Sequence, residues 1–222
     1  MKEIILDTET TGLSVKDGHR IVEIGCIELD NLVPTKNIFH CYLNPERKVS
    51  EKAFEVHGYS DQFLSNKKKF FEIADDFLNF IKDKKIIIHN AEFDISHLNN
   101  ELSIAGKPEI NKEHTVDTLD LARNKFPGSG ISLDALCKRF RIDNSKREKH
   151  TALIDCELLA KVYINLLDQK EPKLNFSKSI DINSVETQNK NITYSKKIVY
   201  PTSEELEQHR EFLKRDLKKN FY

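Results

Sequence analysis

The sequence predicts an α/β layered domain over residues 1–167, then a flexible linker (168–195) and a tail (196–222) with one short helix. Three strand-like segments stand close together at the start, with no long helical pattern between them, so they are expected to pair antiparallel. After residue 70 the pattern changes, and short apolar strands alternate with amphipathic helices. That order is typical of a sheet with helices packed on it.

The first elements follow from residue type and spacing. β-Branched and apolar residues predict strands at Lys2–Leu6, Ile21–Leu29 and Ile38–Leu43. Apolar residues at the spacing of one helix face then predict a single amphipathic helix over Phe70–Ile81. The short run Ile86–Ile88 is typical of a central, buried strand.

The later elements alternate between helix and strand. They are expected in this order: a helix through Leu98 and Leu102 that ends near Gly106, a strand at Thr115–Val116, a helix around Leu119–Ala122, a helix at Leu133–Phe140 capped by Ser132, and a long helix from Ala152 to Leu167. In the tail, Thr202 and Glu205 form a capping box before a narrow apolar stripe. The stretch before that helix is rich in Ser, Thr, Asn and Gln, which predicts a linker.

Composition excludes several classes of protein. The 222 residues are 38% hydrophobic and include 13 Phe, so the chain is globular rather than disordered. No apolar run reaches the ~18 residues that a membrane span needs, and Asp7 follows the start too early for a secretory leader. We therefore expect a cytoplasmic protein without a membrane partner.

Charge and cysteine content exclude two further classes of protein. Thirty-five basic and 36 acidic residues nearly cancel, so the overall field does not indicate a strongly basic nucleic-acid binder. The four cysteines, Cys26, Cys41, Cys137 and Cys156, lie among apolar residues and form no C-x-x-C pair. We expect reduced thiols, with neither a disulfide framework nor a zinc site.

The segment from Asp7 to Gly12 carries the first candidate site. It lies at the carboxyl end of the first strand, where ligand sites of α/β sheets gather. Asp7 and Glu9 are two residues apart and therefore share one face of the strand. Two carboxylates this close repel unless a cation or hydrogen bonds hold them. A strand end with turn-forming Thr and Gly is an equally good interpretation of this segment alone.

Two further carboxylates fall on apolar helix faces. Asp94 follows the Ile86–Ile88 strand, and Asp155 shares a helical stripe with leucines three and four residues later. A carboxylate on a buried face is costly unless it is paired or metal-bound. For Asp94, a favourable contact with the helix dipole explains the residue equally well. His150 stands five residues before Asp155, where a loop can bring it to the same site, although a lone histidine there is more often a cap or a surface residue.

The combination is more informative than its parts. Four carboxylates suit two hard divalent cations, Mg²⁺ or Mn²⁺, which together can activate a water and stabilise a leaving oxygen in phosphodiester hydrolysis. An imidazole can take the proton of that water at neutral pH.

Asp7-x-Glu9, Asn90-x-x-Phe93-Asp94 and His150-x₄-Asp155 resemble the three motifs of the DEDDh branch of ribonuclease-H-like 3′–5′ exonucleases. The sister branch has Tyr four residues before the last Asp, where this chain has Thr151. Val56-His57-Gly58 and the segments Ser132–Cys137 and Ile142–Arg147 are similar to the proofreading epsilon subunits of bacterial DNA polymerase III. The resemblance covers about residues 3–167.

The resemblance implies a mixed five-stranded sheet flanked by helices and assigns roles to side chains. Asp7, Glu9, Asp94 and Asp155 would bind two cations, with Asp7, Glu9 and Asp155 also next to the substrate, and His150 would be the general base. Thr10, Gly12 and Leu13 would line the terminal nucleotide, and His57 would reach its sugar. Lys146 and Arg147 would lie near phosphate. Lys52 departs from the acidic residue that relatives often have, and we assign it no role.

The implied function is a metal-dependent 3′–5′ DNA exonuclease that proofreads for a replicative polymerase and releases 5′-monophosphates from mispaired 3′ ends. Residues 196–222 would bind the polymerase alpha subunit. Glu171–Phe176 is similar to a sliding-clamp peptide, although Glu171 departs from the usual Gln. An exonuclease acting on RNA ends and a catalytically inactive polymerase scaffold are the alternatives; the intact five-residue set argues against the second.

Overall fold

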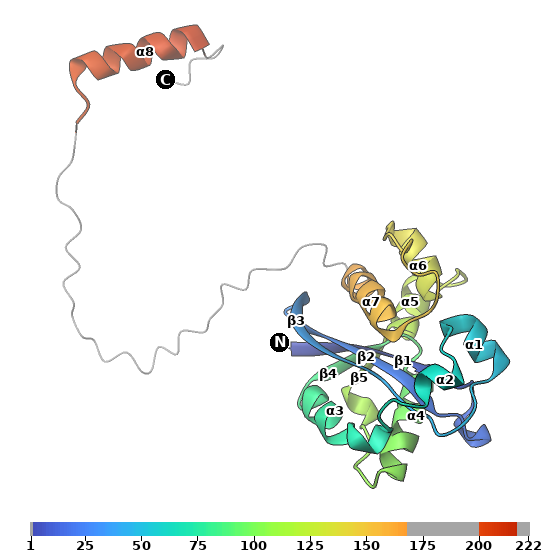
Figure 1. The fold of residues 1–222 in the computed structure, drawn as a ribbon. Coiled ribbons are helices and arrows are strands. Elements are labelled where there is room, and N and C mark those ends of the chain that lie inside the picture. Colours follow the sequence, from blue (N-terminus) through green and yellow to red (C-terminus); the bar gives the residue numbers. More distant parts are fainter. Residues whose placement is uncertain (1, 168–199, 217–222) are drawn as a thin grey trace, which may run out of the picture. The chain divides into compact units, whose positions relative to one another are not determined.

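The computed structural model describes residues 2–167 and 200–216, which belong to two separate units. The first unit contains one sheet with helices on both faces (Figure 1). In the second unit, the described residues 200–216 form one helix, α8 (Ser203–Asp216). The predicted linker and the proposed clamp segment at 171–176 lie outside the described residues.

The sheet has five strands in the order β3-β2-β1-β4-β5. Their bounds are Lys2–Thr10 for β1, Ile21–Asp30 for β2, Val33–Tyr42 for β3, Lys85–Ile88 for β4 and Thr115–Asp117 for β5. β1 pairs antiparallel with β2 and parallel with β4, and β5 continues the parallel half. The predicted mixed five-stranded sheet is confirmed, and the carboxyl ends of β1, β4 and β5 lie at one edge.

The helices divide between the two faces of the sheet, with α3 and α4 on one and α5, α6 and α7 on the other (Figure 1). The bounds are Glu51–His57 for α1, Asp61–Leu64 for α2, Ala74–Ile81 for α3, Ala91–Ile104 for α4, Thr118–Lys125 for α5, Leu133–Phe140 for α6 and Ala152–Leu166 for α7. Short 3₁₀ turns occupy Val15–Asp17, Phe70–Glu72 and Lys112–His114.

Alternation along the central strands builds two separate cores. Ile4 and Leu6 of β1 pack with α3 and α4, whereas Ile5 between them packs with α5, α6 and α7. β4 repeats the pattern, because Ile86 and Ile88 face the first core and Ile87 faces the second. Burial on both faces of the sheet is the reason that Ile4–Leu6 and Ile86–Ile88 are unbroken apolar runs.

The helix predicted over Phe70–Ile81 is wrong in one respect. The chain forms a 3₁₀ turn at Phe70–Glu72 and starts α3 only at Ala74. The Glu72 carboxylate accepts a hydrogen bond from the Lys69 backbone N–H at 2.7 Å, which closes a tight turn before the helix begins. The predicted stripe is nevertheless correct, since Phe70, Ile73, Ala74, Phe77 and Ile81 are buried.

Two predicted helix caps are confirmed. Ser132 caps α6 by accepting from the Ala135 backbone N–H, and Thr202 and Glu205 form the capping box of α8. All four cysteines are free; three are buried and Cys41 is half-buried. Within the described residues, no helix is both long enough and apolar enough to cross a bilayer.

Candidate active site

The four predicted carboxylates and the predicted histidine meet at the carboxyl edge of the parallel strands. All five side chains line one cavity of about 460 Å³. β1 contributes Asp7 and Glu9, the first turn of α4 contributes Asp94, and α7 contributes Asp155. His150 lies in the segment just before α7. Residues separated by up to 148 positions are therefore brought together by the sheet order.

The position of Asp94 is fixed by the strand that carries Asp7 and Glu9. Its Oδ1 accepts hydrogen bonds from the Thr8 backbone N–H at 3.0 Å and from the Thr8 hydroxyl at 2.7 Å. Asp117, at the end of β5, accepts from the backbone N–H groups of Asn90 and Ala91, both at 3.0 Å, and so holds the start of α4. Both contacts orient Asp94 toward β1.

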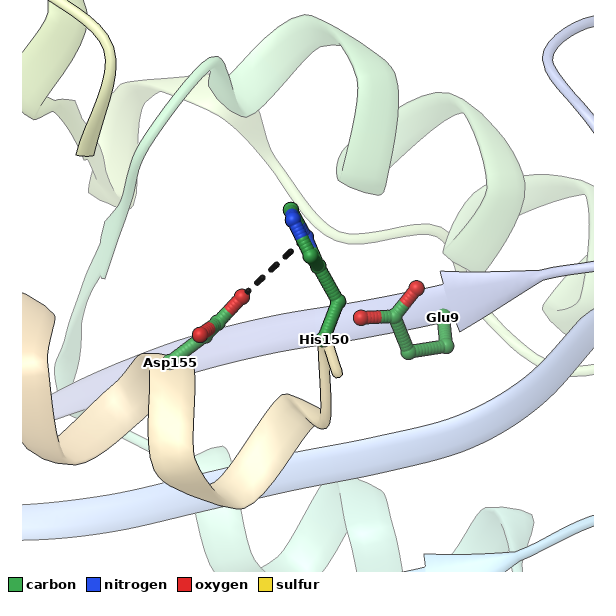
Figure 2. A group of neighbouring side chains, drawn as sticks. All are labelled: Glu9, His150 and Asp155. Carbon is green, nitrogen blue, oxygen red and sulfur yellow. Dashed lines mark ion pairs between the residues drawn. The ribbon is translucent and has the colours of Figure 1, made fainter. Parts of the chain in front are cut away.

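Glu9, His150 and Asp155 form a compact group (Figure 2). One potential ligand atom from each lies within 4.8 Å of the other two. Figure 2 shows the His150 ring between the two carboxylates, and its Nδ1 lies 3.6 Å from Oδ2 of Asp155. These donors come from a strand, a loop and a helix that pack against one another.

A cation of the chain itself also enters this group. The Arg147 side chain is only 7% exposed, and its Nε and Nη2 donate to the two oxygens of Asp155 at 2.5 and 2.7 Å. Its Nη1 donates to Asp134 at 2.7 Å, and Nη2 also contacts His150 Nδ1 at 2.9 Å. Arg147 was expected near phosphate, but here it pairs with a proposed cation ligand.

Burial and mutual repulsion change the acidity of the carboxylates. Burial, together with the negative charge of Asp94, raises the pKa of Asp7 well above its usual range. Burial and the charge of Asp155 raise the pKa of Glu9 to about 8. Burial also raises the pKa of Asp94 to about 7, against the opposing effect of the Thr8 hydrogen bonds. These three carboxyl groups therefore keep their protons to a higher pH than free carboxyl groups do, and a bound cation would take the place of those protons.

The histidine beside them is shifted in the opposite direction. Burial and the positive charge of Arg147 lower the pKa of His150 below its usual value. At neutral pH its imidazole is therefore uncharged, as a group that accepts a proton must be.

The first turn of α7 is anchored to β2 by a buried carboxylate. One oxygen of Glu23 accepts both from the Ala152 backbone N–H at 2.9 Å and from the Tyr59 hydroxyl at 2.8 Å. The other oxygen lies 2.7 Å from Nε2 of His40. At Gly25 a Cβ would lie 2.6 Å from the backbone of Ala152, so only glycine lets the helix approach this closely.

The remaining predicted substrate contacts line a neighbouring cavity of about 480 Å³. Thr10, Gly12, Leu13 and His57 form part of its wall, and both cavities share Glu9. Leu13 is 82% exposed, so an apolar side chain projects freely over the opening. A Cβ at Gly12 would come within 2.3 Å of the His19 ring. These residues are thus gathered beside the carboxylates.

His57 differs from the expectation in one detail. Its Nε2 donates to the Thr10 carbonyl at 3.3 Å, and its Nδ1 accepts from the Tyr59 backbone N–H at 3.0 Å. Both ring nitrogens therefore have partners inside the protein, and the residue is 3% exposed. In this structure His57 shapes the cavity wall.

The donor set fits divalent cations. Asp7, Glu9 and Asp94 have raised pKa values, so a positive charge next to them would be favourable. Their carboxylate oxygens are ligands that hard divalent cations prefer. Asp155 offers further oxygens, and the cluster around Glu9 has the spacing for one ion. Within the described chain no other His, Cys, Asp and Glu group meets that spacing.

Sequence reasoning missed four residues of the site. Thr8, Glu23 and Asp134 were assigned no role, and Arg147 was assigned a different one. Their partners lie 86, 129, 13 and 8 positions away, respectively. Buried polarity was the available signal for Glu23, because a charged residue among the apolar residues of β2 needs a partner.

Comparisons with known proteins identify the family of this chain. Residues 4–163 match the RNase_T exonuclease family model. The DNA polymerase III subunit epsilon of Rickettsia conorii is 50% identical over 98% of this chain and 97% of its own length. Exonuclease X in complex with 5′ overhanging duplex DNA is 26% identical, with a TM-score of 0.58, over 75% of this chain and 92% of that one.

A second solved structure supports the fold alone. The nuclease domain of 3′hExo, a DEDDh family member bound to rAMP, is 17% identical with a TM-score of 0.66, over 76% of this chain and 92% of that chain. The predicted fold, the resemblance to epsilon subunits and the exonuclease activity are confirmed. The chain belongs to the RNase_T exonuclease family, whose DEDDh members depend on divalent metal.

Proposed function

We propose that this exonuclease removes mispaired 3′-terminal nucleotides of DNA as 5′-monophosphates for a bacterial replicative polymerase. The observation that carries the proposal is the convergence of Asp7, Glu9, Asp94, His150 and Asp155 on one cavity. The full-length similarity to polymerase III epsilon subunits supports proofreading as the setting. All four carboxylates and the histidine are present, which disfavours a catalytically inactive polymerase scaffold.

Asp7, Glu9, Asp94 and Asp155 would hold two cations, Mg²⁺ or Mn²⁺, directly or through water. When bound, these ions supply an activated water and stabilise negative charge on the reacting phosphate. His150 takes the proton from the attacking water, because its lowered pKa keeps the imidazole neutral. The water oxygen bonds to phosphorus as the bond to the 3′ oxygen of the preceding nucleotide breaks. That oxygen leaves with the bonding electron pair and takes up a proton from solvent to become the new 3′ hydroxyl, and the terminal nucleotide is released as a 5′-monophosphate.

The chain's own residues set the position of the scissile bond. Thr8 fixes Asp94, and Glu23 fixes the helix that carries Asp155. The second cavity, with Thr10, Gly12 and Leu13, has the place and the apolar character for the terminal base and sugar. Separating the strands at a mispaired end costs less free energy than at a paired end. Because this cavity takes a single strand, mispaired ends reach it more readily.

The tail would hold the enzyme at the polymerase. α8 exposes Leu206 and Phe212, and Tyr200 before it is also exposed. Apolar side chains without cover on their own unit favour a partner surface, here the polymerase alpha subunit. The segment 171–176 would bind the sliding clamp as a short peptide. If a peptide of residues 165–180 shows no measurable binding to the clamp, the clamp-binding role of this segment is wrong.

The test compares four 3′ ends: a paired DNA end, a mispaired DNA end, single-stranded DNA and single-stranded RNA. With Mg²⁺ we expect mispaired and single-stranded DNA to be digested faster than the paired end, with 5′-monophosphates as products. Faster digestion of RNA than of DNA would instead favour the RNA-acting alternative. No hydrolysis of any end would contradict the proposal as a whole.

A further inference from the structure

Asp155, a proposed cation ligand, already has a cationic partner within the chain. Arg147 donates to both carboxylate oxygens, at 2.5 and 2.7 Å, and neither side chain is more than 7% exposed. Paired N–H donors matched to both oxygens of a carboxylate form one of the stronger ion pairs in proteins. The guanidinium thus occupies the oxygens that a bound ion would need.

The same guanidinium also engages the proposed base. Its Nη2 lies 2.9 Å from Nδ1 of His150. A guanidinium carries donors only, so the His150 nitrogen must accept with its lone pair. One side chain therefore contacts a cation ligand and the general base at the same time.

Arg147 has a second carboxylate on its outer side. Nη1 donates to Asp134 at 2.7 Å, and the Asp134 side chain is 55% exposed. Asp134 also accepts from Nδ2 of Asn144 at 2.9 Å, and the Arg147 backbone N–H donates to the Asn144 carbonyl at 3.0 Å. The arginine is anchored at the rim independently of Asp155.

We propose that Arg147 is an internal counter-ion that competes with a divalent cation for Asp155. A cation on the Asp155 oxygens would repel a guanidinium at hydrogen-bond distance, so loading displaces Arg147 from Asp155 and from His150 together. Asp134 keeps the displaced side chain at the edge of the cavity. This inference rests on the proposed function, because it requires Asp155 to bind a cation.

A purely structural ion pair is the competing explanation, and metal affinity separates the two. Loss of a structural pair weakens the fold and leaves cation binding unchanged or poorer. Loss of a competitor makes the cation bind more tightly. Because hydrogen bonds to charged groups are comparatively strong, we expect Arg147→Gln to tighten Mn²⁺ binding by at least about tenfold.

The experiment is a calorimetric titration of the full chain with MnCl₂ alone, at pH 8 and without DNA. Arg147→Lys keeps the charge but loses the bidentate geometry, so it should tighten binding less than Arg147→Gln. Arg20→Gln is the matched control, because Arg20 makes a similar pair with Glu101, at 2.6 and 2.7 Å, away from the cavity. It should leave Mn²⁺ affinity unchanged.

A second readout follows the ring of His150. Addition of MgCl₂ to the wild-type chain should move the ¹⁵N signals of this ring toward those of Arg147→Gln without metal, since both changes remove the same contact. The NMR comparison also shows whether the variant is folded; if it is not, Arg147→Lys replaces it.

Each result has a distinct meaning. Mn²⁺ affinity of folded Arg147→Gln equal to or below that of the wild type overturns the inference. If the wild-type chain itself binds no Mn²⁺, or if Asp155→Asn binds it equally well, the proposed metal site fails instead.

Discussion

Replacement of Glu23 tests whether the anchor beneath α7 holds the catalytic helix in place. In Glu23→Ala, the Ala152 N–H and the Tyr59 hydroxyl lose the oxygen they share, and His40 loses its carboxylate. Ala152 is fully buried, whereas His40 can reach water. An unpaired buried donor costs about 1–3 kcal/mol, so we expect a loss of roughly 3–5 kcal/mol with the cavity included.

Glu23→Gln is the matched control. A single oxygen accepts both the Ala152 and the Tyr59 hydrogen bonds, and the amide oxygen of Gln can take its place. The amide NH₂ then faces Nε2 of His40, a ring nitrogen that can accept in the tautomer with its proton on Nδ1. We expect a loss below about 1.5 kcal/mol, the usual net value of one hydrogen bond.

The measurement is urea unfolding in the presence of a chelator, read at constant m-value, together with hydrolysis of single-stranded DNA. Glu23→Ala should lose stability and most of its turnover, because α7 carries Asp155 and follows His150. Glu23→Gln should retain both. Equal damage from the two variants would show that the charge matters and not the hydrogen bonds, and a loss below about 1 kcal/mol in Glu23→Ala would refute the anchor.

Three further predictions concern pH, Thr8 and the tail. Glu9 and Asp94 bind protons more tightly in the folded chain than in the unfolded chain, because folding raises their pKa values. In the presence of a chelator, the free energy of unfolding should therefore fall as the pH rises from 5 to 8, and Mn²⁺ should restore it. A free energy of unfolding, measured in urea, that stays constant or rises over this pH range would count against the raised pKa values. Thr8→Val removes a hydrogen bond that lowers the pKa of Asp94, so the rising limb of the pH–rate profile should move to higher pH, and an unmoved limb would exclude this role. Truncation after Asp168 should preserve hydrolysis of single-stranded DNA and abolish association with the polymerase subunit in a pull-down; an unfolded body or retained association would contradict the tether.

Local spacing marked these carboxylates as candidates, and the resemblance to DEDDh exonucleases assigned them as cation ligands. Asp7 and Glu9 share a strand face by the two-residue period, and Asp155 lies on a buried helical stripe. The sequence also predicted Asp94, since a carboxylate next to buried apolar positions needs a partner. Such patterns depend on a few neighbouring residues, which is why they are visible in one sequence.

Contacts between distant segments were not predictable in this way. The bond from Ala152 to Glu23 spans 129 positions and exists only because α7 packs over β2. Arg147 is only eight residues from Asp155, but it lies in a polar segment of the kind that is usually exposed. Nothing in that segment predicted that the Arg147 side chain would pair with Asp155. The turn at Glu72 was also missed, because a 3₁₀ turn and an α-helix can bury the same apolar stripe.

The central claim is that His150 is the general base of a metal-dependent 3′–5′ exonuclease. Single-turnover hydrolysis of a mispaired 3′ end, with Mn²⁺ affinity measured in parallel, tests it most directly in His150→Ala. We expect the rate to fall by ~10²–10⁴-fold with Mn²⁺ affinity nearly unchanged, whereas Asp155→Ala should lose both. An unchanged rate in folded His150→Ala, or a loss of Mn²⁺ binding as large as that of Asp155→Ala, would contradict the assignment.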